Sequence, residues 1–138
     1  MRLTHFTDYG MRMLMRMASA PDQPFSTADL AAELQLSRNH LAKIMQRLAQ
    51  AGIVKTRRGG GGGAMLARPP SEIRLGTLVE LLEDRQPIVE CFSDKNNCTL
   101  VGCCSLRNRL QRAEAAFLKE LDDSTLADIA LPSPPQFN

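Results

Sequence analysis

The sequence has few aromatic side chains: its 138 residues include no Trp, one Tyr and five Phe. An aromatic-rich core is therefore excluded, and the 43% of hydrophobic residues must form an aliphatic core in which seven Met act as adaptable filler. No apolar run approaches the ~20 residues that a membrane-spanning helix needs. The N-terminus lacks the hydrophobic segment of a secretory signal. We therefore expect a cytoplasmic protein with no membrane partner.

Recognisable catalytic motifs are also missing. The five glycines at 59–63 fall in neither a G-x-x-x-x-G-K-[ST] nor a G-x-G-x-x-G motif, which argues against a nucleotide site. No Ser/His/Asp or Cys/His arrangement suggests an activated nucleophile. The sequence thus predicts that the chain is not an enzyme.

Charge is divided unevenly along the chain. Residues 1–70 hold ten Lys or Arg against four Asp or Glu, a net charge of +6. Residues 71–138 hold seven against eleven, a net charge of −4. A basic half that binds a polyanion is the simplest interpretation, and chance asymmetry in solvated surface charge is the alternative.

Hydrophobic periodicity predicts a mainly α fold. Thr7, Ser26 and Ser37 are expected to cap the first three helices. The expected helices cover residues 8–20, 27–34, 38–51, 73–83, 105–121 and 125–130, and two strands cover 53–57 and 64–67. A helix-turn-helix followed by a hairpin is a winged helix. We therefore predict a winged-helix DNA-binding domain at 1–84, a loop at 85–104, helices at 105–131 and a disordered tail at 132–138.

Side chains that suit DNA gather at the start of the helix at 38–51 and at the hairpin. Arg can pair with guanine and Asn with adenine in the major groove, whereas Ser and Lys suit phosphates. Glycines at a hairpin tip allow close approach to the DNA backbone, and neighbouring arginines fit a narrow minor groove. The predicted DNA-binding residues are Ser37, Arg38, Asn39, His40, Lys43, Lys55, Arg57, Arg58 and Gly60.

All four cysteines lie in one segment of fourteen residues that has no helix or strand pattern, from Cys91 to Cys104. Thiols stay reduced in the cytosol, so clustered cysteines favour a metal site over disulfides. The spacing lacks a Cys-x-x-Cys pair and is more typical of an iron–sulfur cluster than of structural zinc. A zinc-bound or metal-free winged-helix protein is the alternative from another class.

With these motifs the chain resembles the NsrR/IscR-type winged-helix repressors over residues 1–130. The resemblance rests on the opening Met1-Arg-Leu-Thr-His-Phe-Thr-Asp-Tyr9, on Leu36-Ser-Arg-Asn-His-Leu-Ala-Lys43, on Arg58-Gly-Gly, on Ala67-Arg-Pro-Pro70, on the cysteine loop and on Thr125-Leu-Ala-Asp128. It implies a homodimer on a palindromic double-stranded DNA operator. It also implies that the long helix at 105–121 is the dimerisation helix and that each subunit holds one iron–sulfur cluster.

Two branches of this family differ in the fourth cluster ligand. The IscR branch has a His three residues after its third Cys, but this chain has Arg107 there when counted from Cys104 and Leu106 when counted from Cys103. Neither residue can ligate iron. The NsrR branch, which senses nitric oxide, is more similar, because its fourth ligand is an Asp near the partner's N-terminus, where this chain has Asp8.

The resemblance therefore implies that Cys91, Cys98 and Cys104 hold the cluster together with Asp8 from the partner subunit, with Cys103 as the alternative to Cys104. A 4Fe–4S cluster is favoured and a 2Fe–2S cluster is the alternative. The implied function is a repressor that nitric oxide releases from its operator. A redox or iron-status sensor of the same family is the second hypothesis, and Asp8 as an ordinary first-turn carboxylate is the alternative to its role as ligand.

Overall fold

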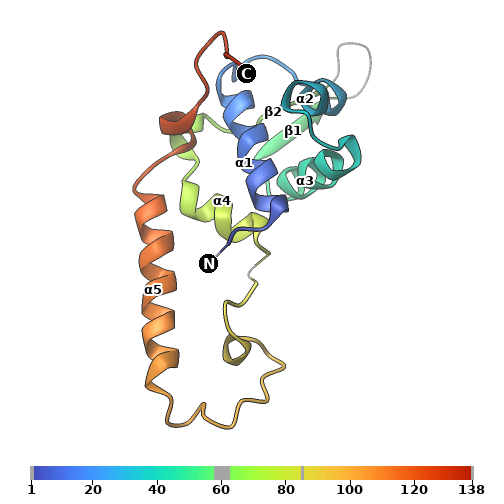
Figure 1. The fold of residues 1–138 in the computed structure, drawn as a ribbon. Helices are drawn as coiled ribbons and strands as arrows, with labels where there is room; N and C mark the ends of the chain where they lie inside the picture. The colour runs from blue at the N-terminus through green and yellow to red at the C-terminus, as the bar shows by residue number, and fades with distance from the viewer. Residues whose placement is uncertain (1, 58–62, 85, 138) are drawn as a thin grey trace.

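A computed structural model describes residues 2–57, 63–84 and 86–137 and has a mainly helical architecture (Figure 1). The α-helices are α1 (His5–Ala18), α2 (Thr27–Leu34), α3 (Arg38–Gln50), α4 (Leu75–Leu82) and α5 (Ser105–Asp122). The strands are β1 (Val54–Arg57) and β2 (Gly63–Leu66), and the 3₁₀ turns are η1 (Pro70–Glu72), η2 (Glu90–Phe92) and η3 (Leu126–Ile129). None of the helices described is both long and apolar enough to cross a membrane.

Helices α2 and α3 form the predicted helix-turn-helix. Each begins at a serine whose Oγ accepts a hydrogen bond from a backbone N–H three residues later: Asp29 for Ser26, at 3.0 Å, and His40 for Ser37, at 3.3 Å. Between them Gln35 has a φ of +54°, in the left-handed region that ends α2 and turns the chain. The serine caps predicted for both helices are confirmed.

The hairpin that follows α3 forms the wing. Strands β1 and β2 pair antiparallel, with Val54 opposite Leu66 and Arg57 opposite Gly63. Phe25 forms a β-bridge with Ala64 of β2, in which the Phe25 N–H donates to the Ala64 carbonyl at 2.8 Å and the Ala64 N–H donates to the Phe25 carbonyl at 2.7 Å. A Cβ on Gly63 would lie 2.8 Å from the Phe25 carbonyl oxygen, so a glycine is needed here. The predicted winged helix is thus confirmed.

The core is aliphatic, as the composition predicts. Its fully buried side chains come from helices α1 to α4, from Ile73 just after η1 and from the η3 turn, and the hairpin and Phe25 extend it. The largest are Met13, Leu14, Met17, Leu30, Leu41, Ile44, Leu48, Ile73, Leu78, Leu82 and Leu126. Burying such side chains contributes about 1.5–3 kcal/mol each to the free energy of unfolding, and this packing fixes α3 against α1.

The predicted start of the first helix was wrong. Helix α1 begins at His5, because the Thr4 Oγ1 accepts a hydrogen bond from the Thr7 N–H at 3.2 Å and so caps the helix. Thr7, predicted as the cap, is fully buried inside the first turn. Asp8 therefore lies on the first turn of α1 itself.

The predicted bounds of the last two short helices were also wrong. Ile73 and Arg74 are extended and pair with the 125–126 segment, with the Leu126 N–H donating to the Ile73 carbonyl at 2.8 Å, so α4 starts only at Leu75. The segment after α5 forms the 3₁₀ turn η3 in place of an α-helix, closed by a capping box between Thr125 and Asp128.

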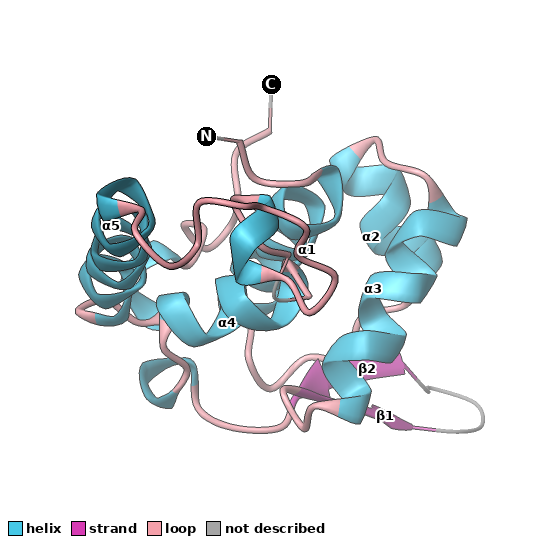
Figure 2. Cartoon of the chain, turned by 90° about the horizontal axis from the view of Figure 1, so that it is seen from below, coloured by secondary structure: helices cyan, strands magenta, loops and turns pink. Residues whose placement is uncertain are grey.

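Helix α5 is fixed to the rest of the molecule mainly at its C-terminal end. The Asp122 Oδ1 accepts a hydrogen bond from the Thr77 N–H at 2.9 Å and so caps α4 from outside. The rest of α5 stands away from the bundle, on the side opposite the hairpin (Figures 1 and 2). Not one residue of α5 is buried.

Candidate nucleic-acid interface and metal centre

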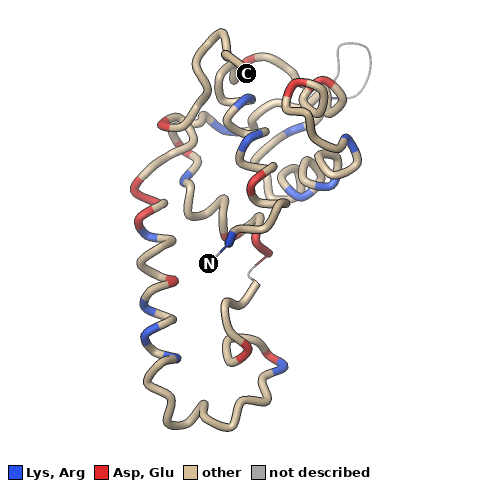
Figure 3. The backbone as a smooth tube through the Cα atoms, in the orientation of Figure 1, with Lys and Arg blue, Asp and Glu red and all other residues tan. Residues whose placement is uncertain are grey.

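The first turn of α3 presents the predicted DNA-reading side chains on the surface. Ser37 caps the turn, and the side chains of Arg38, Asn39 and Lys43 are exposed. The opposite face of α3 is the buried stripe through Leu41, so the polar face must point outward. Lys and Arg lie on α1 and α3, and a separate group lies on α5 (Figure 3). This exposed polar face is what the predicted major-groove contacts require, and the contacts themselves stay predictions.

His40 differs from its neighbours because its ring packs inward. The ring centroid lies 5.2 Å from that of Tyr9, edge to face, and 5.9 Å from that of Phe6. His40 is half-buried in this contact between α3 and α1. A DNA contact by His40 stays a prediction.

The described part of the wing carries basic side chains on strand β1. Lys55 and Arg57 are exposed on β1, while Val54 on the same strand is buried. The predicted contacts Arg58 and Gly60 lie outside the described residues.

The cysteine segment runs from η2 to the start of α5. All four thiols are free; Cys103 is exposed and the other three are half-buried. Cys104 is the N-cap residue directly before α5. Over residues 2–57, 63–84 and 86–137, no three His, Cys, Asp or Glu side chains are close enough to one another to hold a metal ion. The structure therefore does not bring the predicted ligands Cys91, Cys98 and Cys104 together into one site.

The chemistry of the segment nevertheless fits an iron–sulfur cluster. Its free thiols are the ligand type that such clusters take. Three residues after Cys104, the Nε of Arg107 is buried without a hydrogen-bond partner in the described part of the chain, although its guanidinium lies 5.9 Å from the Phe92 ring centroid. A buried, unsatisfied N–H is costly, and an acceptor such as a cluster sulfide would remove that cost.

Asp8 lies on the DNA-binding half, separate from the cysteines. Arg12 donates two hydrogen bonds to it, from Nε to Oδ1 at 3.0 Å and from Nη2 to Oδ2 at 2.7 Å. The Asp8 side chain is 43% exposed and the Arg12 side chain 50%. The carboxylate is therefore accessible to a second molecule, though it already has a partner.

Sequence reasoning missed the contacts that join the C-terminal end of α4 to the DNA-binding helices. The Glu83 Oε1 accepts hydrogen bonds from the Thr4 N–H at 2.7 Å and from the Thr4 Oγ1 at 3.1 Å. The Nη2 of Arg47 on α3 lies 3.7 Å from the Oδ2 of Asp84. The Arg47 guanidinium also stacks over the Phe6 ring, 4.7 Å from the ring centroid. No periodic pattern marks these residues, because their partners are distant in sequence. The Asp8–Arg12 pair, in contrast, has the i,i+4 spacing that a sequence can reveal.

Comparisons with known proteins agree with this arrangement. Residues 3–131 match the Rrf2 family, described as an iron-dependent transcriptional regulator. The chain is 40% identical over 131 residues to the HTH-type transcriptional regulator NsrR of Bacillus subtilis (strain 168), covering 94% of this chain and 90% of that protein. It is 38% identical over 133 residues to the regulator of the same name from Shouchella clausii (strain KSM-K16), covering 95% and 89%.

Among solved structures, T. potens IscR superposes with a TM-score of 0.75 at 25% identity, covering 94% of this chain and 85% of that one. The fold and the regulators that it matches confirm the predicted resemblance, and these matches are transcriptional regulators and not enzymes. The chain belongs to the Rrf2 family of transcriptional regulators.

Proposed function

We propose that this regulator is a homodimeric repressor that binds a palindromic operator and senses nitric oxide through an iron–sulfur cluster. The observation that carries the proposal is the junction at Cys104. There a segment with four free thiols leads directly into α5, a helix with no buried residue. A candidate metal segment and a candidate dimer helix are thus adjacent in one chain that also has a helix-turn-helix.

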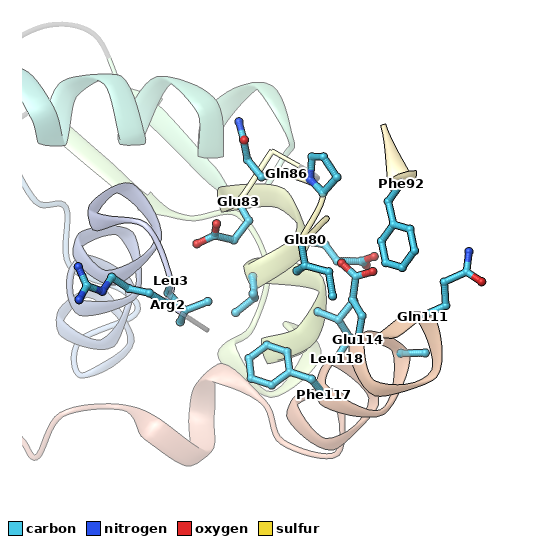
Figure 4. A pocket seen from close by; sticks show the side chains of 14 residues that line it. Arg2, Leu3, Glu80, Glu83, Gln86, Phe92, Gln111, Glu114, Phe117 and Leu118 are labelled. Carbon is cyan, nitrogen blue, oxygen red and sulfur yellow. The ribbon is translucent and has the colours of Figure 1, made fainter. Parts of the chain in front are cut away.

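The exposure of α5 supports the dimer. Leu106 on α5 is 63% exposed, and large apolar side chains left in water are unfavourable. An open groove of about 650 Å³ runs between α4, the following linker and α5, lined by apolar side chains such as Phe117 and by Glu80, Glu83 and Glu114 (Figure 4). A partner helix that crosses α5 would cover the exposed face.

The charges along α5 favour an antiparallel crossing. The end next to the cysteines is basic, with Arg107, Arg109 and Arg112, and the other end has Glu120 and Asp122 beside Lys119 (Figure 3). In an antiparallel pair, the basic end of each helix would face the acidic end of its partner. Such complementarity selects orientation more than it adds affinity.

In this proposal Cys91, Cys98 and Cys104 supply three thiolates, and Asp8 of the partner subunit supplies a carboxylate oxygen. The thiols must come together as the group binds, which is usual when a metal orders its own loop. When bound, the cluster supplies iron that reacts with nitric oxide. Asp8 is the most easily displaced of the four ligands, because a carboxylate is harder than a thiolate.

The cross-subunit position of Asp8 would connect this chemistry to DNA binding. Asp8 lies on α1, which packs against the recognition helix α3. A dimer reads two half-sites about one helical turn apart, so its two recognition helices need a fixed separation. Release of Asp8 from the partner's loop would remove one constraint on that separation and lower the affinity for the operator.

An anaerobic preparation tests the cofactor first. We expect a brown protein with visible absorption, and the iron and sulfide contents distinguish a 4Fe–4S from a 2Fe–2S cluster. A colourless protein that contains zinc or no metal would reject the proposal. Loss of operator affinity upon addition of nitric oxide would then support the sensing function.

Iron-status sensing is the second candidate function, and the description of the matching family as iron-dependent favours it. In that case removal of iron by a chelator would change DNA binding, whereas substoichiometric nitric oxide would not. Parallel titrations with a chelator, a mild oxidant and nitric oxide separate the two functions.

A further inference from the structure

A continuous set of side-chain contacts joins Asp8 to the start of the recognition helix. Arg12 holds Asp8 through two hydrogen bonds, and its guanidinium lies 5.5 Å from the Tyr9 ring centroid. The Tyr9 ring in turn contacts the His40 ring edge to face, at 5.2 Å with an interplanar angle of 75°. The contacts therefore reach from the first turn of α1 to the first turn of α3.

His40 is held at two points. Its backbone N–H donates to the Ser37 Oγ at 3.3 Å, which makes it part of the cap of α3. Its ring is held by Tyr9 and, at 5.9 Å, by Phe6. The exposed residues Arg38 and Asn39 lie between the cap and His40, so a displacement of the His40 backbone would displace them as well.

The Asp8 carboxylate cannot keep its present partner unchanged and also ligate iron. Both of its oxygens accept hydrogen bonds from Arg12. If one oxygen binds iron, the forked pairing with Arg12 is weakened or lost. The Arg12 guanidinium is then free to change its position over Tyr9, so the two states of Asp8 differ in what surrounds the Tyr9 ring.

We propose that Tyr9 and His40 are positioning residues that carry the state of Asp8 to the recognition helix. The inference rests on the proposed function, since it assumes that Asp8 alternates between Arg12 and the cluster. It adds the route within the subunit. Loss of the Asp8 pairing changes the position of the Arg12 guanidinium, which changes the position of the Tyr9 ring, and His40 moves with Tyr9. The route uses the ring of Tyr9, for which the described structure records no hydroxyl hydrogen bond.

The test compares the wild type with Tyr9→Leu, Tyr9→Phe and the matched control Phe137→Leu. Phe137 is 49% exposed and belongs to none of these contacts. The probe is a labelled duplex of about 30 base pairs, long enough for two half-sites, selected from a random library by the cluster-loaded wild type. The measured quantity is the switching ratio, defined as the DNA Kd after nitric oxide treatment divided by the Kd before it.

We expect Tyr9→Leu to load a cluster with the wild-type absorption spectrum but to reduce the switching ratio about twofold to tenfold, the range that one aromatic pair supports. Tyr9→Phe and Phe137→Leu should keep the wild-type ratio. If Tyr9→Leu changes both Kd values by the same factor, the contact is merely structural and the inference is overturned.

A second measurement uses the wild type alone, in case Tyr9→Leu folds poorly. Hydrogen exchange of residues 5–12 and 37–41 should rise together when nitric oxide is added. A rise at 5–12 without a change at 37–41 would overturn the inference. If the wild-type switching ratio is one, the proposed function is rejected as well. If the wild type switches and Tyr9→Leu has the same switching ratio, only the proposed route through Tyr9 and His40 is rejected.

Discussion

Replacement of Asp8 by Ala separates the ligand role of this residue from its role in folding. In the folded chain Asp8 makes an exposed i,i+4 pair with Arg12 and lies on the first turn of α1. Such a pair contributes about 0.3–0.5 kcal/mol, and a first-turn carboxylate contributes about 0.3–1 kcal/mol through the helix dipole. The total is about 1 kcal/mol, which corresponds to a fall in Tm of about 4 °C for a domain of this size.

The assay compares cluster-free and cluster-loaded protein. We expect cluster-free Asp8→Ala to melt within about 5 °C of the wild type, as the small local contribution requires. The loaded variant should lose its cluster faster and show little difference in DNA affinity with and without nitric oxide. The control is Asp29→Ala, which removes an exposed first-turn carboxylate from α2 and should leave the cluster unchanged.

Two results would refute this reasoning. Normal cluster stability and a normal nitric oxide response in Asp8→Ala would show that Asp8 is not a ligand. A much larger loss of stability in the cluster-free variant would show that the local contacts of Asp8 were undervalued.

Three further tests, with four variants, address other parts of the account. Cys104→Ser should prevent cluster loading while Cys103→Ser leaves the iron and sulfide contents unchanged; the reverse pattern would make Cys103 the third ligand. Arg38→Ala should weaken operator binding by about 1–3 kcal/mol in a fluorescence anisotropy titration, with no change in the melting temperature, and an unaltered Kd would remove Arg38 from the reading surface. Gly76→Ala should lower the free energy of unfolding by about 1–3 kcal/mol in urea, because the added Cβ would collide with the Leu118 backbone carbonyl. A variant as stable as the wild type would show that α5 can move aside freely.

The elements with strong local signals were the ones that the sequence predicted well. Ser26 and Ser37 are followed by clear apolar stripes, and both cap helices as expected. The first helix was misplaced because Thr4 and Thr7 are both acceptable caps, and only the burial of Thr7 in the packed fold decides between them. Local propensity cannot resolve such a choice.

The start of α4 depended on a contact that no local pattern reveals. Residues 73 and 74 have helical neighbours, but they pair in an extended conformation with residues 125 and 126, and Asp122 supplies the cap. Each partner is about fifty residues away, so tertiary structure overrode helix propensity.

The candidate site was predictable to different degrees. Arg38, Asn39 and Lys43 lie exposed where helical periodicity placed them. His40 carries the same kind of signal, yet its ring turns toward α1, because the aromatic neighbours Phe6 and Tyr9 come from another helix. The convergence of the cysteines depends on a bound group, so neither the sequence nor the fold of the chain alone brings them together.

The most direct test of the central claim is an anaerobic titration of the cluster-loaded, DNA-bound protein with nitric oxide. Visible absorption of the cluster and fluorescence anisotropy of the duplex are recorded on the same samples. The account predicts that the cluster absorption and the DNA-bound fraction fall together, over the same amount of nitric oxide per cluster. Cluster absorption that disappears while the protein stays fully bound to DNA would contradict it.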